Sequence, residues 1–376
     1  MAKIALVTDS YYAVNGVSRT YQQLAKYCKS KKINLDIFTI GKNKKNTSNG
    51  SVNIYQFAAK WPVNYYYDLP PFDVKIISPG LKETFNKKEY DIVHLATPGS
   101  LGIAVRSMIN KDKIPVVGVF HTLLAEYASS WAEKGLEKFP EYFKNPTAGI
   151  TQAAVWQFLK WFYAKSNIVL APSKNIEKKI KILERPTEIF PRGVDIKTFN
   201  PSFKNKKNKK ITALYVGRLS TEKNIDLLVQ IFKNYNKAEL WMVGDGPYKQ
   251  GLKAQLPNAK FFGYLKGKKL SEVYANADFF VFPSITDTFG NVILEAQASG
   301  IPAIVTEFGG PKELIDNKKT GLIVKANNKD FKKAVNYMVN NPEKTKKMGK
   351  NALREAKEKS WDKAFDKLFK IYKNLI

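Results

Sequence analysis

Short apolar runs alternate with amphipathic stretches along the whole chain. Runs that are rich in Val, Ile, Leu and aromatic residues and bounded by turn residues are predicted as strands: Ile4–Thr8, Leu35–Thr39, Ile54–Phe57, Ile92–Ala96, Val116–Phe120, Ile168–Ala171, Glu188–Phe190, Ala213–Val216, Leu240–Val243, Lys260–Phe262, Phe279–Phe282, Ala303–Val305 and Leu322–Val324. Segments with apolar residues at helical spacing, such as Val17–Lys29, Ala148–Ala164 and Asn224–Tyr235, separate most of them. This alternation predicts an α/β protein whose parallel sheets are covered on both faces by helices.

A polar, lysine-rich stretch divides the strands into two sets. Pro201–Lys210 suits a linker, and the α/β pattern restarts at Ile211. We predict two Rossmann-like domains, over residues 1–195 and 211–358, joined by a basic linker at 196–210. Residues 359–376 have apolar positions at helical spacing and are predicted as a separate terminal helix. Because open α/β sheets bind ligands at the carboxyl ends of their strands, we expect the ligands in a cleft between the two domains.

The chain carries a formal net charge of +29, from 62 Lys and Arg residues against 33 Asp and Glu residues. A field of this sign attracts an anionic membrane surface, an anionic substrate or nucleic acid. Only 6 of the basic residues are Arg, the side chain expected to read base edges, and no nucleic-acid motif is present, so nucleic acid is disfavoured. The excess of Lys also fits compositional drift in an AT-rich genome, which would leave part of the charge without a function.

Cellular location is predicted from what the chain lacks. No run reaches the about 18 uninterrupted apolar residues of a membrane span. The apolar run at the N-terminus is closed by Asp9 and is too short for a signal peptide. Cys28 is the single cysteine, which excludes an intrachain disulfide. We therefore expect a cytoplasmic protein.

The segment from Pro283 to Pro302 carries the clearest chemistry. It runs from the end of a buried strand through a turn, which holds Asp287, into a helix that holds Glu295. The N–H groups at a helix start have no partner within the helix and can face an anion, and those predicted here belong to Phe289, Gly290, Asn291 and Val292. Gly290 lets a ligand approach the main chain. The segment predicts a site for a sugar and a phosphate; the alternative is an ordinary turn with a capping Asp.

A second basic turn follows the first strand of the second domain. Arg218 and Lys223 lie five residues apart between a strand and a helix. A guanidinium fork and a mobile ammonium group can converge there on a diphosphate and neutralise a leaving nucleotide. Taken alone, such a turn is more often a solvated loop.

Together these motifs resemble the retaining glycosyltransferases of family 4, and the resemblance covers nearly the whole chain. Arg218 and Lys223 match the family's phosphate-binding pair, and Asp287 and Glu295 match its two acids, although the family usually has Glu where this chain has Asp287. The resemblance implies the GT-B fold, with the terminal helix crossing back to the first domain. Thr286–Asn291 and Thr97–Gly99 resemble the branch that glycosylates diacylglycerol-type lipids or transfers mannose.

Two residues of the first domain also match the family. Gly16 precedes a predicted helix, where a backbone amide can approach a phosphate, and the family's glycine at this place faces the donor phosphates. His121 ends a strand at the side of the cleft, and the family places a His there against the donor sugar. His94 lies within a strand and is interpreted as structural. No Gly-x-Gly-x-x-Gly follows the first strand, which argues against a nicotinamide or flavin enzyme.

Metal-independent chemistry is expected. Two histidines without cysteine partners do not make a usual zinc site, and no Asp-x-Asp is present to hold a metal-bound diphosphate. The resemblance implies a front-face mechanism without a protein nucleophile, in which Arg218 and Lys223 take the place of the ion. Glu295 is then expected on the ribose and Asp287 on the sugar, with Asp287, His121, Arg218 and Lys223 as the catalytic set. No cofactor is expected, since the nucleotide sugar is a substrate.

The resemblance predicts a hexosyltransferase that moves glucose from UDP-glucose to a membrane lipid such as diacylglycerol, on the inner face of the cell membrane. Aromatic residues flanked by lysines, at Trp61–Phe72 and at Trp131, Phe139, Tyr142 and Phe143, suit a membrane surface or core packing under a loop. A GDP-mannose-dependent α-mannosyltransferase is the alternative within enzymes. A non-catalytic protein that binds nucleotide sugars or polyanions is the alternative of another class.

Overall fold

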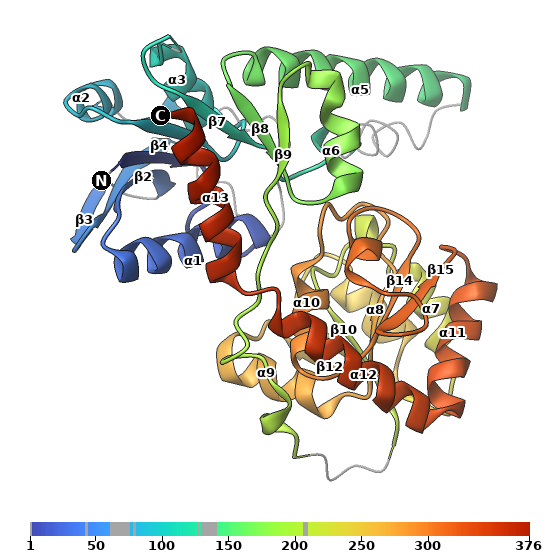
Figure 1. Ribbon diagram of the computed structural model, residues 1–376. Helices are drawn as coiled ribbons and strands as arrows, with labels where there is room; N and C mark the ends of the chain where they lie inside the picture. The colour runs from blue at the N-terminus through green and yellow to red at the C-terminus, as the bar shows by residue number, and fades with distance from the viewer. Residues whose placement is uncertain are drawn as a thin grey trace. The chain divides into compact units, whose positions relative to one another are not determined.

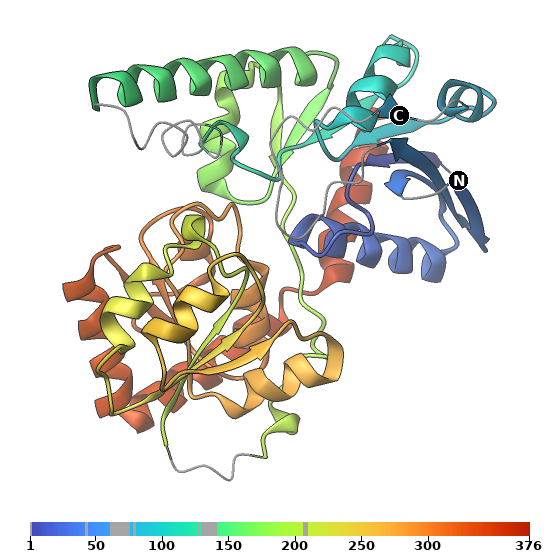
Figure 2. The same ribbon diagram turned by 180° about the vertical axis from the view of Figure 1, so that it is seen from behind.

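The structure is a computed structural model that describes residues 2–41, 44–60, 76–77, 80–110, 112–126, 128, 141–205 and 210–376. The chain forms two compact units (Figures 1 and 2). The first comprises Met1–Pro191 together with Phe365–Ile376, and the second comprises Arg192–Ala364. Each unit contains its own sheet and its own buried core, as two Rossmann-like domains require.

The first unit is built on a mainly parallel sheet in the order β3-β4-β2-β1-β6-β7-β8-β9. Its parallel strands are β1 (Lys3–Thr8), β2 (Asn34–Gly41), β4 (Val52–Lys60), β6 (Ile92–Leu95), β7 (Val116–Val119), β8 (Ile168–Ala171) and β9 (Thr187–Ile189). All seven correspond to predicted strands. β1, β2, β6, β7 and β8 are largely buried apolar runs, whereas β4 and β9 are only partly buried. The antiparallel strands β3 (Lys45–Asn49) and β5 (Ile76–Ile77) pair with β4 and were not predicted. The side chains of β3 are polar and exposed, so the strand has no apolar pattern to read.

Helices connect these strands. They are α1 (Gly16–Lys31), α2 (Leu81–Asn86), α3 (Ser100–Met108), α5 (Glu141–Tyr163), α6 (Lys174–Ile180) and the 3₁₀ turn η1 (Lys181–Leu183). Leu159, Phe162 and Tyr163 of α5 are buried in the core of the first unit, as their helical spacing predicts. Trp156 packs against the same core and is partly buried.

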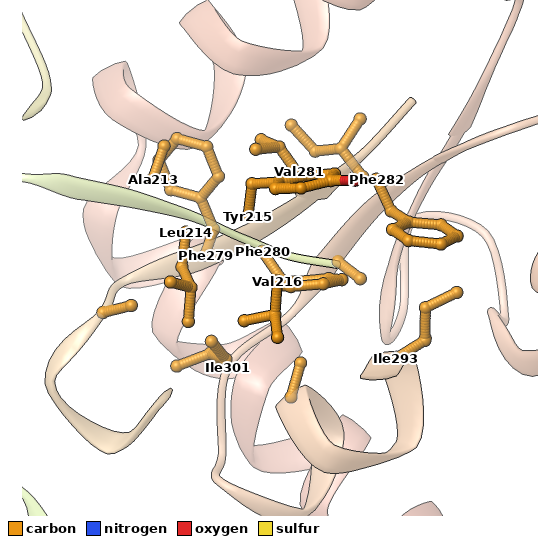
Figure 3. Close-up of a cluster of buried hydrophobic side chains, with 14 of the residues drawn as sticks. Ala213, Leu214, Tyr215, Val216, Phe279, Phe280, Val281, Phe282, Ile293 and Ile301 are labelled. Carbon is orange, nitrogen blue, oxygen red and sulfur yellow. The ribbon is translucent and has the colours of Figure 1, made fainter. Parts of the chain in front are cut away.

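The second unit contains an entirely parallel sheet in the order β12-β11-β10-β13-β14-β15. Its strands are β10 (Thr212–Val216), β11 (Glu239–Val243), β12 (Lys260–Gly263), β13 (Phe279–Phe282), β14 (Ala303–Thr306) and β15 (Gly321–Val324). All six are predicted strands. Numbered from β10, the spatial order is 3-2-1-4-5-6, the order of a Rossmann sheet, so the α/β prediction is confirmed. Figure 3 shows side chains of β10 and β13 packed together with Ile293 and Ile301.

Helices lie on both faces of this second sheet (Figures 1 and 2). The helices of this unit are η2 (Pro201–Phe203), η3 (Thr221–Lys223), α7 (Asp226–Phe232), α8 (Lys249–Gln255), α9 (Gly267–Asn276), α10 (Asn291–Ala298), η4 (Pro311–Leu314), α11 (Asn328–Asn340) and α12 (Pro342–Lys357), and they are followed by α13 (Trp361–Leu375). The last of these, α13, begins in the second unit and continues in the first from Phe365 onward. There the Tyr27 hydroxyl of α1 donates to Asp366, and the Tyr27 ring stacks on Phe369.

The predicted linker is displaced from the actual division of the chain. The chain passes from the first unit to the second between Pro191 and Arg192, so the described residues of 196–210 belong to the second unit. Phe199 is buried in its core, and the Thr198 carbonyl accepts a hydrogen bond from Ser271. The polar composition of this segment reflects its exposed side, while the single buried ring of Phe199 ties it to the domain that follows.

No helix in the described part of the chain is long and apolar enough to cross a membrane.

Candidate active site

The predicted donor-site residues of the second unit lie at the switch point of its sheet. Strands β10 and β13 are direct neighbours, with Ala213 opposite Phe279. From β10 the chain continues to β11 on one side, and from β13 it continues to β14 on the other. The turns at the carboxyl ends of β10 and β13 therefore diverge and leave a place for a ligand, as in other open α/β sheets. Arg218 and Lys223 lie in the first of these turns, and Asp287 lies in the second.

An ion pair joins the two turns. The Lys223 ammonium nitrogen lies 2.9 Å from both carboxylate oxygens of Asp287. The two side chains are 16% and 21% exposed, so water screens the pair less than it screens an ordinary surface ion pair. Two further contacts run between the same turns: the Asn224 amide donates to the Pro283 carbonyl, and the Thr286 hydroxyl donates to the Glu222 carbonyl. An ion pair and two hydrogen bonds thus hold the two turns together.

Asp287 does not cap α10, so the alternative of a capping Asp is wrong. Gly290 occupies the N-cap position, and no side chain accepts a hydrogen bond there. The carboxylate of Asp287 points to Lys223 instead. The negative charge of Asp287 is therefore paired with Lys223 in the neighbouring turn and does not cap the helix.

A hydrogen bond from Tyr215 supports the basic turn after β10. The Tyr215 side chain is buried, and its hydroxyl donates to the Arg218 carbonyl at 2.9 Å. Burial, more than the nearby carboxylates, raises the pKa of Tyr215, so the hydroxyl keeps its proton and remains a donor. Lys223 ends η3, and Asn224 then takes a left-handed conformation with φ 54°. Arg218 itself is half-buried in the same turn.

The start of α10 presents backbone donors and an unsatisfied amide. Gly290 has φ 93°, a conformation that favours glycine, and a Cβ added there would lie 2.9 Å from the Ile293 side chain. Ile293 and Leu294 are fully buried, which fixes how the helix start is oriented. Among the described residues, the Asn291 side-chain oxygen is buried and has no hydrogen-bond partner. A polar ligand at this helix start would satisfy it.

Phe289 and Val292 are predicted to contribute through their main-chain N–H groups. The Phe289 ring is buried in the core of the second unit, and Val292 packs against that core. Phe289 therefore leaves mainly its backbone groups to a ligand, whereas the side chain of Val292 is partly exposed.

Glu295 is the more deeply buried of the two acids. It is 3% exposed, and its carboxylate accepts a hydrogen bond of 3.1 Å from the hydroxyl of Tyr274 on α9. The same hydroxyl lies 3.2 Å from the Val292 carbonyl, so Tyr274 ties Glu295 to the first turn of α10. Tyr274 was missed in the sequence, because its helical spacing with Leu270 and Val273 indicates only a core position.

A glycine pair after β14 supports the turn of Asp287 from the other side. The Gly310 N–H donates to the Asp287 carbonyl at 3.0 Å. A Cβ added to Gly310 would lie 2.0 Å from the Thr288 carbonyl oxygen, so any larger residue would push this turn away. These glycines were also missed, since a Gly-Gly pair in the sequence signals a turn without naming its neighbour.

Gly16 and His121 lie in the first unit. Gly16 is exposed and begins α1, and Asn15 caps this helix by accepting the Ser18 N–H at 2.8 Å. His121 follows β7 after Phe120, and its Nε2 atom lies 2.7 Å from the hydroxyl of Tyr21 on α1. Both residues therefore lie at the carboxyl ends of parallel strands, next to the place where β1 and β6 diverge.

The aromatic stretches predicted for the acceptor lie mostly outside the described residues. This applies to Trp61–Phe72, Trp131 and Phe139, and only the backbone of Tyr142 and Phe143 is described, as part of α5. Within the described residues, no group of three or more His, Cys, Asp and Glu side chains is arranged to hold a metal ion.

The chain is similar to several known proteins. Residues 14–198 match the family Glycosyltransferase Family 4, and residues 197–355 match the family Glycosyl transferases group 1. A GDP-mannose-dependent alpha-mannosyltransferase of Corynebacterium glutamicum is 30% identical over 79% of this chain and 71% of its own length. An alpha-monoglucosyldiacylglycerol synthase of Streptococcus pneumoniae is 28% identical over 85% of this chain and 75% of its own length. The sulfoquinovosyl transferase SQD2 of Arabidopsis thaliana is 26% identical over 81% of this chain, which spans 60% of that relative.

The fold has a close counterpart among solved structures. Sucrose-phosphate synthase from Thermosynechococcus elongatus superposes with a TM-score of 0.80 over 100% of this chain and 99% of that chain, at 19% identity. Two units with Rossmann-type sheets, the second with a charged pair at its switch point, define a two-domain α/β protein of the Rossmann type. The chain belongs to the GT-B glycosyltransferases of family 4 and group 1.

Proposed function

We propose that this glycosyltransferase moves a hexose from a nucleotide diphosphate sugar to a membrane lipid with retention of configuration, with UDP-glucose as donor and diacylglycerol as acceptor. The observation that carries the donor part is the Lys223–Asp287 pair at the switch point of the second sheet, beside the uncapped start of α10. The two joined turns and the helix start bring a cation, an acid and backbone N–H donors close together. The lipid acceptor is supported by the similarity to the synthase of monoglucosyldiacylglycerol.

The reaction breaks the bond between the anomeric carbon and the diphosphate oxygen and forms a bond from that carbon to the acceptor oxygen on the same face. The electron pair of the broken bond stays on the diphosphate, whose charge Arg218, Lys223 and the start of α10 stabilise. The acceptor hydroxyl loses its proton to a diphosphate oxygen. Gly16 supplies a further backbone donor in this proposal, and His121 faces the sugar. No metal ion is required, because these donors take its place.

Lys223 can serve both the acid and the phosphate. An ammonium group has three donors, so it can hold an Asp287 oxygen and a phosphate oxygen at the same time. Asp287 would then keep Lys223 in position between donor cycles and accept hydrogen bonds from the sugar hydroxyls. Glu295, which is buried and held by Tyr274, is suited to accept hydrogen bonds from the two ribose hydroxyls of the nucleotide.

A GDP-mannose-dependent mannosyltransferase is the second candidate. The similarity to the mannosyltransferase of Corynebacterium glutamicum supports it. That relative is 30% identical to this chain, and the alpha-monoglucosyldiacylglycerol synthase of Streptococcus pneumoniae is 28% identical. In this proposal the donor residues named above contact the diphosphate, the ribose and the sugar. Both UDP-glucose and GDP-mannose contain these parts, so an experiment must identify the base and the hexose.

The membrane location follows from charge. With a net charge of +29, the protein would bind the anionic inner face of a cell membrane peripherally, where it meets a lipid acceptor.

A panel of UDP-glucose, UDP-galactose and GDP-mannose, each with vesicles that contain diacylglycerol, tests the proposal. We expect UDP-glucose to yield a glycolipid and stoichiometric UDP. Transfer from GDP-mannose alone would favour the second candidate, and release of nucleotide without a lipid product from every donor would overturn the lipid acceptor.

A further inference from the structure

The outer side of α5 is apolar, although it points away from the core of the first unit. Val155, Leu159 and Phe162 lie on the inner side of this helix and are buried in that core. On the opposite side, Ile150 is 70% exposed and Trp161 is 48% exposed. A helix that is apolar on both of its sides usually has a partner on each of them.

The exposed residues form one row along the helix, which we call the outer stripe: Ile150, Ala154, Gln157 and Trp161. Their spacing of three to four residues brings each of them to the same side of successive turns. The outer stripe is about 16 Å long, at 1.5 Å per residue. Figures 1 and 2 show α5 at the border of the first unit, with β8 and α6 on one side of it.

Charged side chains are scarce in this part of the chain. Charged residues make up 25% of the whole sequence, whereas residues 149–163 contain only Lys160. A helix whose outer side contacts only water normally carries charged and polar residues there. The composition therefore indicates that the outer stripe meets an apolar environment.

Basic side chains lie beside the outer stripe. The Arg106 guanidinium of α3 lies 3.9 Å from the centre of the Trp161 ring. Lys160 pairs with Glu184 at 2.9 Å, next to η1, which contacts α5 and carries the exposed Lys181. Aromatic and aliphatic side chains with cations beside them are typical of a helix that lies in the surface of an anionic bilayer.

We propose that the outer stripe of α5 docks on an anionic lipid bilayer, with Ile150 and Trp161 inserted at the boundary between headgroups and acyl chains. The proposal rests on the proposed function in naming a lipid surface as the partner. It goes beyond attraction by the overall charge, because it assigns the contact to one side of one helix. No helix in the described part of the chain can cross a membrane, so α5 would lie along the surface.

A second copy of this chain fits the outer stripe less well than a bilayer does. Each copy carries a net charge of +29, and pairing through α5 would bring the basic residues beside the two stripes together. A stable protein–protein interface also buries about 800 Å² on each partner, more than one row of four side chains offers. An anionic bilayer has the complementary charge and needs only the side chains that enter it.

Lipids brominated on their acyl chains quench tryptophan fluorescence and thereby measure the insertion of Trp161. The protein has 6 Trp residues, so the contribution of Trp161 is the difference between the wild type and Trp161→Phe. With anionic vesicles at low salt, we expect brominated lipid to quench the wild type more strongly than Trp161→Phe. Equal quenching of the two proteins would place Trp161 outside the bilayer and overturn the proposal.

Vesicle binding measures what the outer stripe adds to the electrostatic attraction. In a variant with both Ile150→Gln and Trp161→Gln, the Kd for anionic vesicles at low salt should rise about tenfold or more, because two apolar side chains no longer leave water. Ile196→Gln is the matched control: it removes an exposed apolar side chain from the second unit and should bind like the wild type. All of these proteins should detach at high salt, since the stripe adds to the charge and does not replace it.

An unchanged vesicle Kd in the double variant, or a wild type that binds no vesicles, would overturn the proposal. Circular dichroism would confirm that the double variant is folded, as its exposed positions lead us to expect. A dimer that the double variant loses, with vesicle binding unchanged, would assign the outer stripe to a second copy instead. These measurements need no donor sugar, so they decide on the outer stripe even if the protein transfers no sugar to a lipid.

Discussion

Replacing Lys223 by Met tests the charged pair at the switch point and separates its two effects. The substitution keeps a similar length and removes the charge, which leaves the Asp287 carboxylate without the ammonium that contacts both of its oxygens. An exposed ion pair contributes about 0–1 kcal/mol, and breaking a fully buried pair costs about 3–5 kcal/mol. With side chains 16% and 21% exposed, this pair lies between the two cases, so we expect a loss of about 1–3 kcal/mol in the free energy of unfolding.

The effect on catalysis should be larger than this loss of stability implies. Lys223 is proposed to stabilise the charge that develops on the departing diphosphate, and removing one such group typically lowers kcat about 10²–10³-fold. Urea unfolding would measure the stability, and transfer from the best donor, at a temperature where the variant is fully folded, would measure the rate. The nucleoside diphosphate should also bind more weakly to the variant.

Lys88→Met is the matched control. Lys88 forms an ion pair of 2.8 Å with the buried Asp36 of β2, in the first unit. We expect a comparable loss of stability and a transfer rate close to that of the wild type. If Lys223→Met loses stability but transfers sugar at the normal rate, the pair is structural and the assignment of the diphosphate to this turn is refuted.

Other predictions concern the acid, the metal, the membrane and the thiol. Asp287→Asn should abolish most transfer because an amide cannot hold Lys223 as a carboxylate does, while Asp287→Glu should keep partial activity; equal rates in both variants would remove Asp287 from the sugar site. Transfer should survive EDTA, and a complete loss that magnesium or manganese restores would contradict metal-independent chemistry. The protein should float with anionic vesicles at low salt and detach near about 0.5 M salt, where screening lengths fall to a few Å; failure to float at low salt would mean that the positive charge has no membrane role. Burial raises the pKa of the Cys28 thiol to about 12, so its thiolate fraction at pH 8 is about 10⁻⁴ and iodoacetamide should label it only after unfolding; fast labelling of the folded protein would contradict this.

The elements of the fold that could be predicted from the sequence are mainly those with buried apolar runs. Every predicted strand is present, and most of them have enough apolar length to be recognised without their neighbours. The polar strand Lys45–Asn49 escaped prediction because backbone pairing with β4, and not side-chain burial, makes it a strand. The domain division was placed too far along the chain, because one buried residue, Phe199, outweighs the polar composition around it.

The site shows the same limit. The two acids and the two basic residues were recognisable from their spacing in the sequence, but the pairing of Lys223 with Asp287 was not, since it depends on which strands are neighbours in the sheet. Tyr274 could not be recognised in the sequence, because its helical spacing is that of a core residue and only its hydroxyl contacts Glu295. His94 was interpreted as structural, and its partners Tyr21 and Tyr372 lie 73 and 278 residues away in the sequence, beyond any local pattern.

The configuration of the product tests the central claim most directly. The wild-type protein would be incubated with UDP-α-glucose and vesicles that contain diacylglycerol, and the anomeric proton of the glycolipid would be recorded by NMR as UDP is released. We predict an α-linked glucosyl lipid formed in a one-to-one ratio with UDP. A β-linked lipid would contradict retention, and release of free glucose in place of a lipid product would contradict transfer to a lipid.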